Sequence, residues 1–304
     1  MSLSRKTILI VISFFAIYVI WGSTYLLNKI AVTELAPFFL ASIRFLTSGI
    51  LIFIIAKTMG VSLKLTRPQF INVIITAFLF LVYGNGVFVW ALRYVDSGFG
   101  ALEASTQPLF VLILMWLIDG KKIQLQSFIG ILLGIIGMYV LVSQKDLVAN
   151  EGSLLGMFMI LTCVLSWSYG SVFVSKANLP ANYFVSTGYQ MIAAGVMLAI
   201  SSLAFNETWV SPFNWSEPVV WSMLFLIIFG SIAAFTAFNY LLKVVSTEKV
   251  ATSAYVNPVI ALILGWYVLD EVLTLQSIIA AVILLTGVYF ITSKRKIKIR
   301  PFGR

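Results

Sequence analysis

The chain has 304 residues, of which 61% are hydrophobic and only 10% are charged. Soluble domains contain about 25% charged residues, so this composition excludes a water-facing surface over most of the chain. The net charge of +9 does not indicate a nucleic-acid partner, because the basic residues lie between apolar segments. We expect membrane lipid and a small-molecule substrate as partners, and the oligomeric state is left open.

The reactive residue types are sparse. Cys163 is the single cysteine and histidine is absent, which excludes an internal disulfide and the commonest metal ligands. No phosphate-binding glycine motif is present. We therefore expect no cofactor and no metal, and any proton chemistry must fall to a carboxylate.

Apolar segments of about 20 residues are long enough to cross a bilayer as helices. Residues 5–20 begin like a signal peptide but show no cleavage site, so they are interpreted as part of a retained first span. The sequence predicts an all-α polytopic membrane protein with ten transmembrane helices. The predicted spans are 7–29, 36–56, 69–92, 97–118, 125–143, 153–175, 182–204, 219–242, 249–269 and 275–293.

The distribution of Lys and Arg between the links predicts the orientation. With the N-terminus in the cytoplasm, the outer side holds only Lys29, Arg93 and Lys145. The cytoplasmic side holds Arg5, Lys6, Lys57, Lys64, Arg67, Lys121, Lys122, Lys176, Lys243, Lys249, Lys294, Arg295, Lys296, Lys298, Arg300 and Arg304. Cytoplasmic loops of membrane proteins are enriched in these residues, so both termini are predicted to be cytoplasmic.

The two halves of the chain match each other at an offset of about 150 residues. Residues 89–97 align with 239–247, and Gln107-Pro108 aligns with Asn257-Pro258. Five spans per half would place the second copy in the membrane in inverted orientation, which is typical of transporters. The predicted units are a first repeat at 1–147, an inverted second repeat at 148–293, and a basic cytoplasmic tail at 294–304.

Several short motifs follow one another along the chain: Trp21-Gly22-Ser23 with Lys29, Arg44-Phe45, the Pro108 and Pro258 helices, and Asp270-Glu271-Val272-Leu273-Thr274 before Gly287-Val288-Tyr289. In this order they resemble the EamA family of the drug/metabolite transporter superfamily. The resemblance covers about residues 7–293. It implies gradient- or proton-coupled export of amino acids, related metabolites or amphipathic toxic compounds across the inner membrane.

The sequence departs from this family pattern at two places. Asp119-Gly120-Lys121 stands where the first repeat of the family usually has a glutamate, and Gln190 occupies the counterpart of Arg44. Roles in one half therefore need not hold in the other.

Glu103 is the one carboxylate predicted to lie deep within a span. It falls on one helical stripe with Asp96, Gly100 and Gln107, and that stripe ends at Pro108. A deep acid should face a cavity or a partner. It is interpreted as a coupling acid, as a structural partner of Arg44, or as a group nearer the interface.

Arg44 is interpreted as a second coupling residue, with a substrate carboxylate or Glu103 as its counter-ion, or as a side chain that snorkels to the headgroups. Lys29 and Lys176 are interfacial anchors or gate contacts. Pro108 and Pro258 are expected to break their helices and to line a central cavity. The predicted substrate-binding residues, each with packing as its alternative, are Trp21, Ser23, Tyr83, Asn85, Trp90, Gln107, Trp167, Tyr169, Asn239, Tyr255 and Asn257.

Three function classes remain for such a chain. A secondary transporter fits the inverted repeats, with export as the expectation and import of the same solutes as the alternative. A membrane-embedded enzyme would need clustered acids or a nucleophile set, which the sequence does not show, so there is no catalytic residue to name. A sensor would need a soluble output domain, and no link is long enough to form one.

Overall fold

A computed structural model of the chain describes residues 5–120, 123–144, 151–174, 176–245, 250 and 253–292. The side chains of Arg5, Asp119, Lys243, Tyr255 and Thr292 are outside this description. The predicted boundary between the two repeats and the basic tail at 294–304 also lie outside the described residues.

Every regular element in these described ranges is helical. Eight helices are long and apolar enough to cross a membrane, and two shorter apolar helices lie at Val256–Leu269 and Leu275–Ile291. The chain is therefore consistent with a polytopic membrane protein. The elements are α1 (Arg5–Phe15), η1 (Ala16–Ile20), α2 (Trp21–Ala31), α3 (Pro37–Thr58), α4 (Arg67–Ala77), η2 (Phe78–Val87), α5 (Phe88–Ala91), α6 (Ser97–Ala104), α7 (Gln107–Asp119), α8 (Leu125–Val142), α10 (Ser153–Val174), α11 (Tyr183–Ala204), η3 (Pro212–Asn214), α12 (Glu217–Phe225), η4 (Leu226–Ala233), α13 (Ala234–Val244), α15 (Ser253–Leu269) and α16 (Leu275–Thr292).

The two prolines act differently. The helix is interrupted at Ser105 and Thr106, and α7 starts again with Pro108 in its first turn, where a missing N–H breaks no intrahelical bond. Pro258 lies inside α15, which continues through it, contrary to the expectation of a break. Only one hydrogen bond, near the start of α15, is lost there. The predicted stripe from Asp96 to Gln107 likewise does not run along one continuous helix.

Three long helices contain π-helical segments near their middles. In each case the π-helical segment joins two labelled elements of one long helix: η1 joins α1 to α2, η2 joins α4 to α5, and η4 joins α12 to α13. Displaced by 150 residues, η2 overlaps η4, so the two halves share this irregularity. Wider helical turns of this kind often occur at functional sites, because they redirect side chains and carbonyls.

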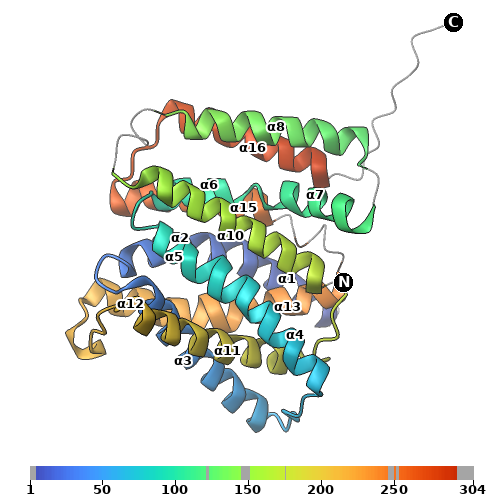
Figure 1. Cartoon of the computed structure of the whole chain (residues 1–304), viewed down its shortest axis with the longest axis vertical. Coiled ribbons are helices and arrows are strands. Elements are labelled where there is room, and N and C mark those ends of the chain that lie inside the picture. Colours follow the sequence, from blue (N-terminus) through green and yellow to red (C-terminus); the bar gives the residue numbers. More distant parts are fainter. Residues whose placement is uncertain are drawn as a thin grey trace, which may run out of the picture.

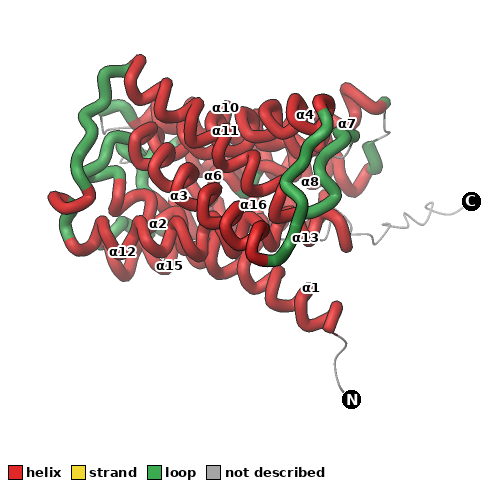
Figure 2. Tube along the Cα trace, turned by 90° about the horizontal axis from the view of Figure 1, so that it is seen from below, coloured by secondary structure: helices red, strands yellow, loops and turns green. Residues whose placement is uncertain are grey.

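Glycines bring two helix pairs into close contact at opposite ends of the long axis (Figure 1). A Cβ on Gly195 of α11 would lie 2.8 Å from the Leu46 backbone nitrogen of α3. A Cβ on Gly130 of α8 would lie 2.6 Å from the Gly287 carbonyl oxygen of α16. Small residues permit such close packing between helices in membranes. The elements with π-helical segments lie between these two pairs, and the described loops lie at the ends of the helices (Figure 2).

Candidate functional site

The Arg44 guanidinium is the best-defined polar centre between the helices. Its side chain is 4% exposed, so it does not reach the surface, and snorkelling is not its role. Nε donates to Ser231 Oγ at 2.8 Å, and Nη1 donates to Asn28 Oδ1 at 3.3 Å and Asn85 Oδ1 at 3.5 Å. These partners come from α2, η2 and η4, so three other segments converge on α3 at this point.

All of these partners are uncharged. A guanidinium offers five N–H donors, and the two on Nη2 have no hydrogen-bond partner among the described residues. Nη2 faces Gly230, where an added Cβ would lie 3.4 Å away. Within the described part of the chain, Arg44 is therefore a buried cation without a carboxylate partner, and a buried charge of that kind is costly unless a counter-ion binds.

An aromatic cluster lies beside this centre. Trp21 Nε1 donates to the Gly230 carbonyl at 3.1 Å, which places the indole next to the backbone that faces Nη2. The Trp21 ring packs against Trp167 and Phe238, with centroids 6.1 and 5.0 Å away, and Phe80 packs on Trp167 at 4.9 Å. Trp21 and Trp167 are half-buried. Such rings offer an apolar surface next to a donor group, which suits an amphipathic solute.

Glu103 lies near the end of α6 and is 2% exposed. Its Oε2 atom is buried and has no hydrogen-bond partner among the described residues. The Glu103 carboxylate is near enough to act electrostatically on the Cys163 thiol, whose Sγ lies 3.3 Å from the Tyr83 carbonyl oxygen. Among the described residues no ion pair joins Glu103 to Arg44, so the contacts of Arg44 do not support the interpretation of Glu103 as its structural partner.

The segment η2 contacts Arg44 directly and is connected to Glu103 through Cys163. Asn85 in η2 contacts Arg44, while the Tyr83 carbonyl in the same segment contacts Cys163 beside Glu103. Gly84 permits close packing of η2 against α10, because a Cβ there would lie 3.0 Å from the Trp167 ring. A change in the winding of η2 would therefore affect the surroundings of both groups.

The predicted amide residues mainly hold helices together. Asn239 Nδ2 donates to Thr187 Oγ1 at 2.7 Å. With its amide nitrogen facing η1, Asn257 donates to the Ile17 and Tyr18 carbonyls at 2.9 and 2.8 Å. These carbonyls belong to a π-helical segment, so Asn257 ties α15 to η1.

The other predicted residues lie in varied settings. Ser23 donates to its own helix at the Ile20 carbonyl, and the Gln107 carbonyl accepts from Ser168. Trp90 packs on Phe38 and Phe205. Tyr169 is 45% exposed, and Tyr255 lies on α15 with its side chain outside the described part. Pro108 and Pro258 are both buried.

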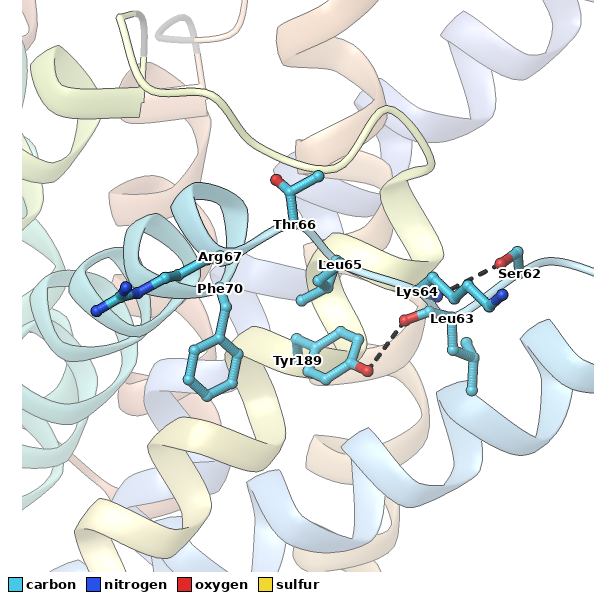
Figure 3. Close-up of a pocket in the computed structure, with 8 residues that line it drawn as sticks. All are labelled: Ser62, Leu63, Lys64, Leu65, Thr66, Arg67, Phe70 and Tyr189. Atoms are coloured by element: carbon cyan, nitrogen blue, oxygen red, sulfur yellow. Dashed lines mark hydrogen bonds between the residues drawn. The ribbon is translucent and has the colours of Figure 1, made fainter.

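A cavity of about 770 Å³ lies away from these charged residues, between the α3–α4 link and α11 (Figure 3). Its lining includes Lys64, Arg67 and Tyr189, whose hydroxyl donates to the Leu63 carbonyl at 3.0 Å. Lys64 and Arg67 point to opposite sides rather than toward one anion (Figure 3). The open hollow is therefore not the candidate site.

A second group of charges lies where α2 ends and α6 begins. Lys29 Nζ donates to the Leu92 and Val95 carbonyls at 2.6 and 2.7 Å. Burial raises the pKa of the adjacent Asp96 carboxyl, the Glu271 carboxylate raises it further, and the Lys29 ammonium opposes both. Lys29 thus joins α2 to the backbone that precedes α6.

Sequence reasoning missed Asn28, Ser231 and Gly230 as neighbours of Arg44. Asn28 does share a helix face with Thr24, and Gly230-Ser231 interrupts an apolar run. Those signals mark polar positions within spans, but contacts between distant spans follow only from the packing.

The long apolar helices are those of a polytopic membrane protein, and the buried polar centre around Arg44 lies between them. The chain matches the EamA-like transporter family over residues 8–143 and 154–293, and it belongs to that family. It is 36% identical over 288 residues to the uncharacterized inner membrane transporter YedA of Escherichia coli strain K12, covering 92% of each chain.

More distant relatives are also transporters by name. One is the uncharacterized transporter YoaV of Bacillus subtilis, 23% identical over 95% of this chain and 99% of that one. Another is a probable amino-acid metabolite efflux pump of Escherichia coli strain K12, 24% identical over 90% and 91%. A solved crystal structure shares the fold with a TM-score of 0.67 at 20% identity, covering 94% of this chain and 96% of that one.

Proposed function

We propose that this chain is a secondary active transporter that exports amino acids or related small amphipathic metabolites across the inner membrane, coupled to protons. The observation that supports this most strongly is Arg44, a buried guanidinium with neutral partners, whose two Nη2 donors are unused among the residues that the structure describes. A substrate carboxylate would supply the missing charge through a charge-assisted hydrogen bond. The name of the amino-acid metabolite efflux pump supports the same solute class.

The proposed substrate position lies between Arg44 and the aromatic cluster. The carboxylate would accept from Nη2, and the apolar part of the solute would lie against Trp21, Trp167 and Phe238. Asn85 and Ser231 would keep the guanidinium oriented, because each already accepts from it. Selection would then rest on one anionic group and a moderate apolar body.

Glu103 is the proposed coupling acid. Its Oε2 atom has no partner in the described ranges to hold the ionised form, so its proton occupancy can follow the exposure of the site to one side or the other. Export needs the proton and the solute to occupy the site in alternation. The segment η2, which contacts Arg44 through Asn85 and Cys163 through Tyr83, offers a physical connection between Arg44 and the surroundings of Glu103.

We also propose ten membrane crossings arranged as two inverted repeats, 1–147 and 148–293, with both termini cytoplasmic. The family match in two stretches and the overlap of η2 with η4 support the repeat. The excess of Lys and Arg on one side supports the orientation.

Uptake into inverted membrane vesicles tests the function. Vesicles that contain the chain should accumulate an amino-acid substrate when a proton gradient is imposed, and Arg44→Gln should abolish this uptake. Arg44→Lys keeps the charge but loses the forked geometry, so about 1–10% of the uptake should remain. The exposed Arg67→Gln is the matched control. Uptake only in right-side-out vesicles would indicate import, and uptake unaffected by Arg44→Gln would contradict the proposed site.

A further inference from the structure

Two carboxylates from the second half of the chain cap two helices of the first half. Glu207 accepts from the Phe38 and Phe39 backbone N–H groups at 3.1 and 2.8 Å, at the start of α3. Glu271 accepts from the Ser97 and Gly98 N–H groups at 2.7 and 3.0 Å, at the start of α6. The first N–H groups of a helix have no intrahelical acceptor and attract negative charge.

The two capped helices are the ones that contain the deep charged groups. Arg44 lies about two turns after the start of α3, and Glu103 lies in the last turn of α6. Each helix is a stiff connection between its cap and its charged side chain. Releasing a cap would free the helix end to move and would change the position of the charged group.

The loop geometry holds Glu271 in place. Its backbone N–H donates to the Gly265 carbonyl at 3.2 Å, and Asp270 before it has a φ of 53°, a left-handed conformation uncommon outside glycine. A Cβ on Gly265 would collide with the Glu271 carboxylate, so glycine is required for this approach. Lys29 crosses from α2 to the carbonyls just before α6 and strengthens the same end.

The first half of the chain has no acidic residue at the positions that correspond to Glu271 and Glu207. The position 150 residues before Glu271 is Lys121, and the position 146 residues before Glu207 is Val61. The helix equivalent to α3 is α11, and its start is capped locally by Asn182, which accepts from Phe184 N at 2.9 Å. The repeat therefore does not reproduce the caps that Glu207 and Glu271 form at the starts of α3 and α6.

We infer that Glu207 and Glu271 are positioning residues for transport, which close one end of the substrate pathway by holding α3 and α6. The charge distribution makes this the outer end, and the inference rests on the proposed function for its role in a transport cycle. Opening toward the outside would require these carboxylates to leave the helix starts.

Cys163 provides a direct test because it is the single cysteine, is 1% exposed and lies within electrostatic range of Glu103. A membrane-impermeant maleimide would be added to intact cells and, separately, to inverted vesicles. In Glu271→Gln and Glu207→Gln, a neutral amide with a single acceptor oxygen replaces the two carboxylate oxygens that accept from the helix start. Labelling of Cys163 from the outer face should therefore accelerate about tenfold. Glu217→Gln, an exposed acid at the start of α12, is the matched control and should label like the parent.

The outcomes separate positioning from unfolding. An opened pathway raises labelling from one face only, whereas unfolding raises it from both faces and lowers the unfolding temperature in detergent. Glu271→Asp retains the charge and should label more slowly than Glu271→Gln. Unchanged outer labelling in both glutamine variants would overturn the inference. If labelling changes as expected but the parent transports no solute, the caps stand and the proposed function fails.

Discussion

Arg44 Nε donates to Ser231 Oγ at 2.8 Å and so joins α3, in the first half of the chain, to η4 in the second. Because Ser231 is 1% exposed, no water can replace it easily. The bond is therefore expected to orient the guanidinium toward the substrate position.

Ser231→Ala should weaken substrate binding more than it weakens folding. Loss of a partner from a buried charged donor costs about 1–3 kcal/mol, so we expect the transport KM to rise about tenfold. Ser42→Ala is the control, since Ser42 lies on α3, is equally buried and donates to the Gly195 carbonyl at 3.0 Å. An equal KM change in both variants would show that Ser231 only supports packing.

Glu103→Gln keeps the side-chain shape and removes the charge. We expect proton-driven accumulation to be lost, while exchange of labelled for unlabelled solute survives at least in part. Radiolabelled uptake and counterflow in the same proteoliposomes measure the two modes. If accumulation against a gradient persists with unchanged pH dependence, Glu103 is a structural residue.

Asp96 should make stability depend on pH. Burial raises the pKa of its carboxyl, Glu271 raises it further, and Lys29 opposes this. A raised folded-state pKa favours the protonated form, so this contribution to stability is present at low pH and lost as pH rises. Asp96→Asn should therefore raise the unfolding temperature at about pH 7 and have a smaller effect near pH 4. Thermal unfolding in detergent measures this, and equal effects at both pH values would be evidence against it.

The glycine contact between α8 and α16 should tolerate no side chain. Gly130→Ala would press a Cβ against the Gly287 carbonyl, so we expect a loss of about 1–3 kcal/mol of stability. Gly134→Ala is the control on the same helix, because its Cβ would meet only the flexible end of Leu109. Similar unfolding temperatures for the two variants would mean that the helix pair can separate at little cost.

Hydropathy located the helices well, because the requirement for long apolar segments acts on each span separately. The span expected at 36–56 is α3 (Pro37–Thr58), and that expected at 125–143 is α8 (Leu125–Val142). The break at Ser105 and Thr106 lies inside the predicted span 97–118, and Pro108, not hydropathy, was the signal for it. Apolar composition does not reveal such a break, because both halves of the segment remain hydrophobic.

The candidate site was only partly predictable. Arg44 and Glu103 are recognisable because charged residues are rare in apolar spans. The separation of Arg44 from Glu103 could not be predicted, since the distance between two spans depends on how all the helices pack. The π-helical winding of η2 also has no clear sequence signal beyond Gly84 and Gly86, because it depends on contacts such as Trp167 against Gly84.

Proton movement driven by solute tests the central claim most directly. Proteoliposomes with an imposed pH gradient and an internal pH dye would be supplied with a panel of amino acids. For the parent protein, we expect at least one amino acid to collapse the gradient faster, with no such effect in Arg44→Gln or Glu103→Gln. If no amino acid moves protons through the parent, or if both variants respond like the parent, proton-coupled amino-acid transport at this site is contradicted.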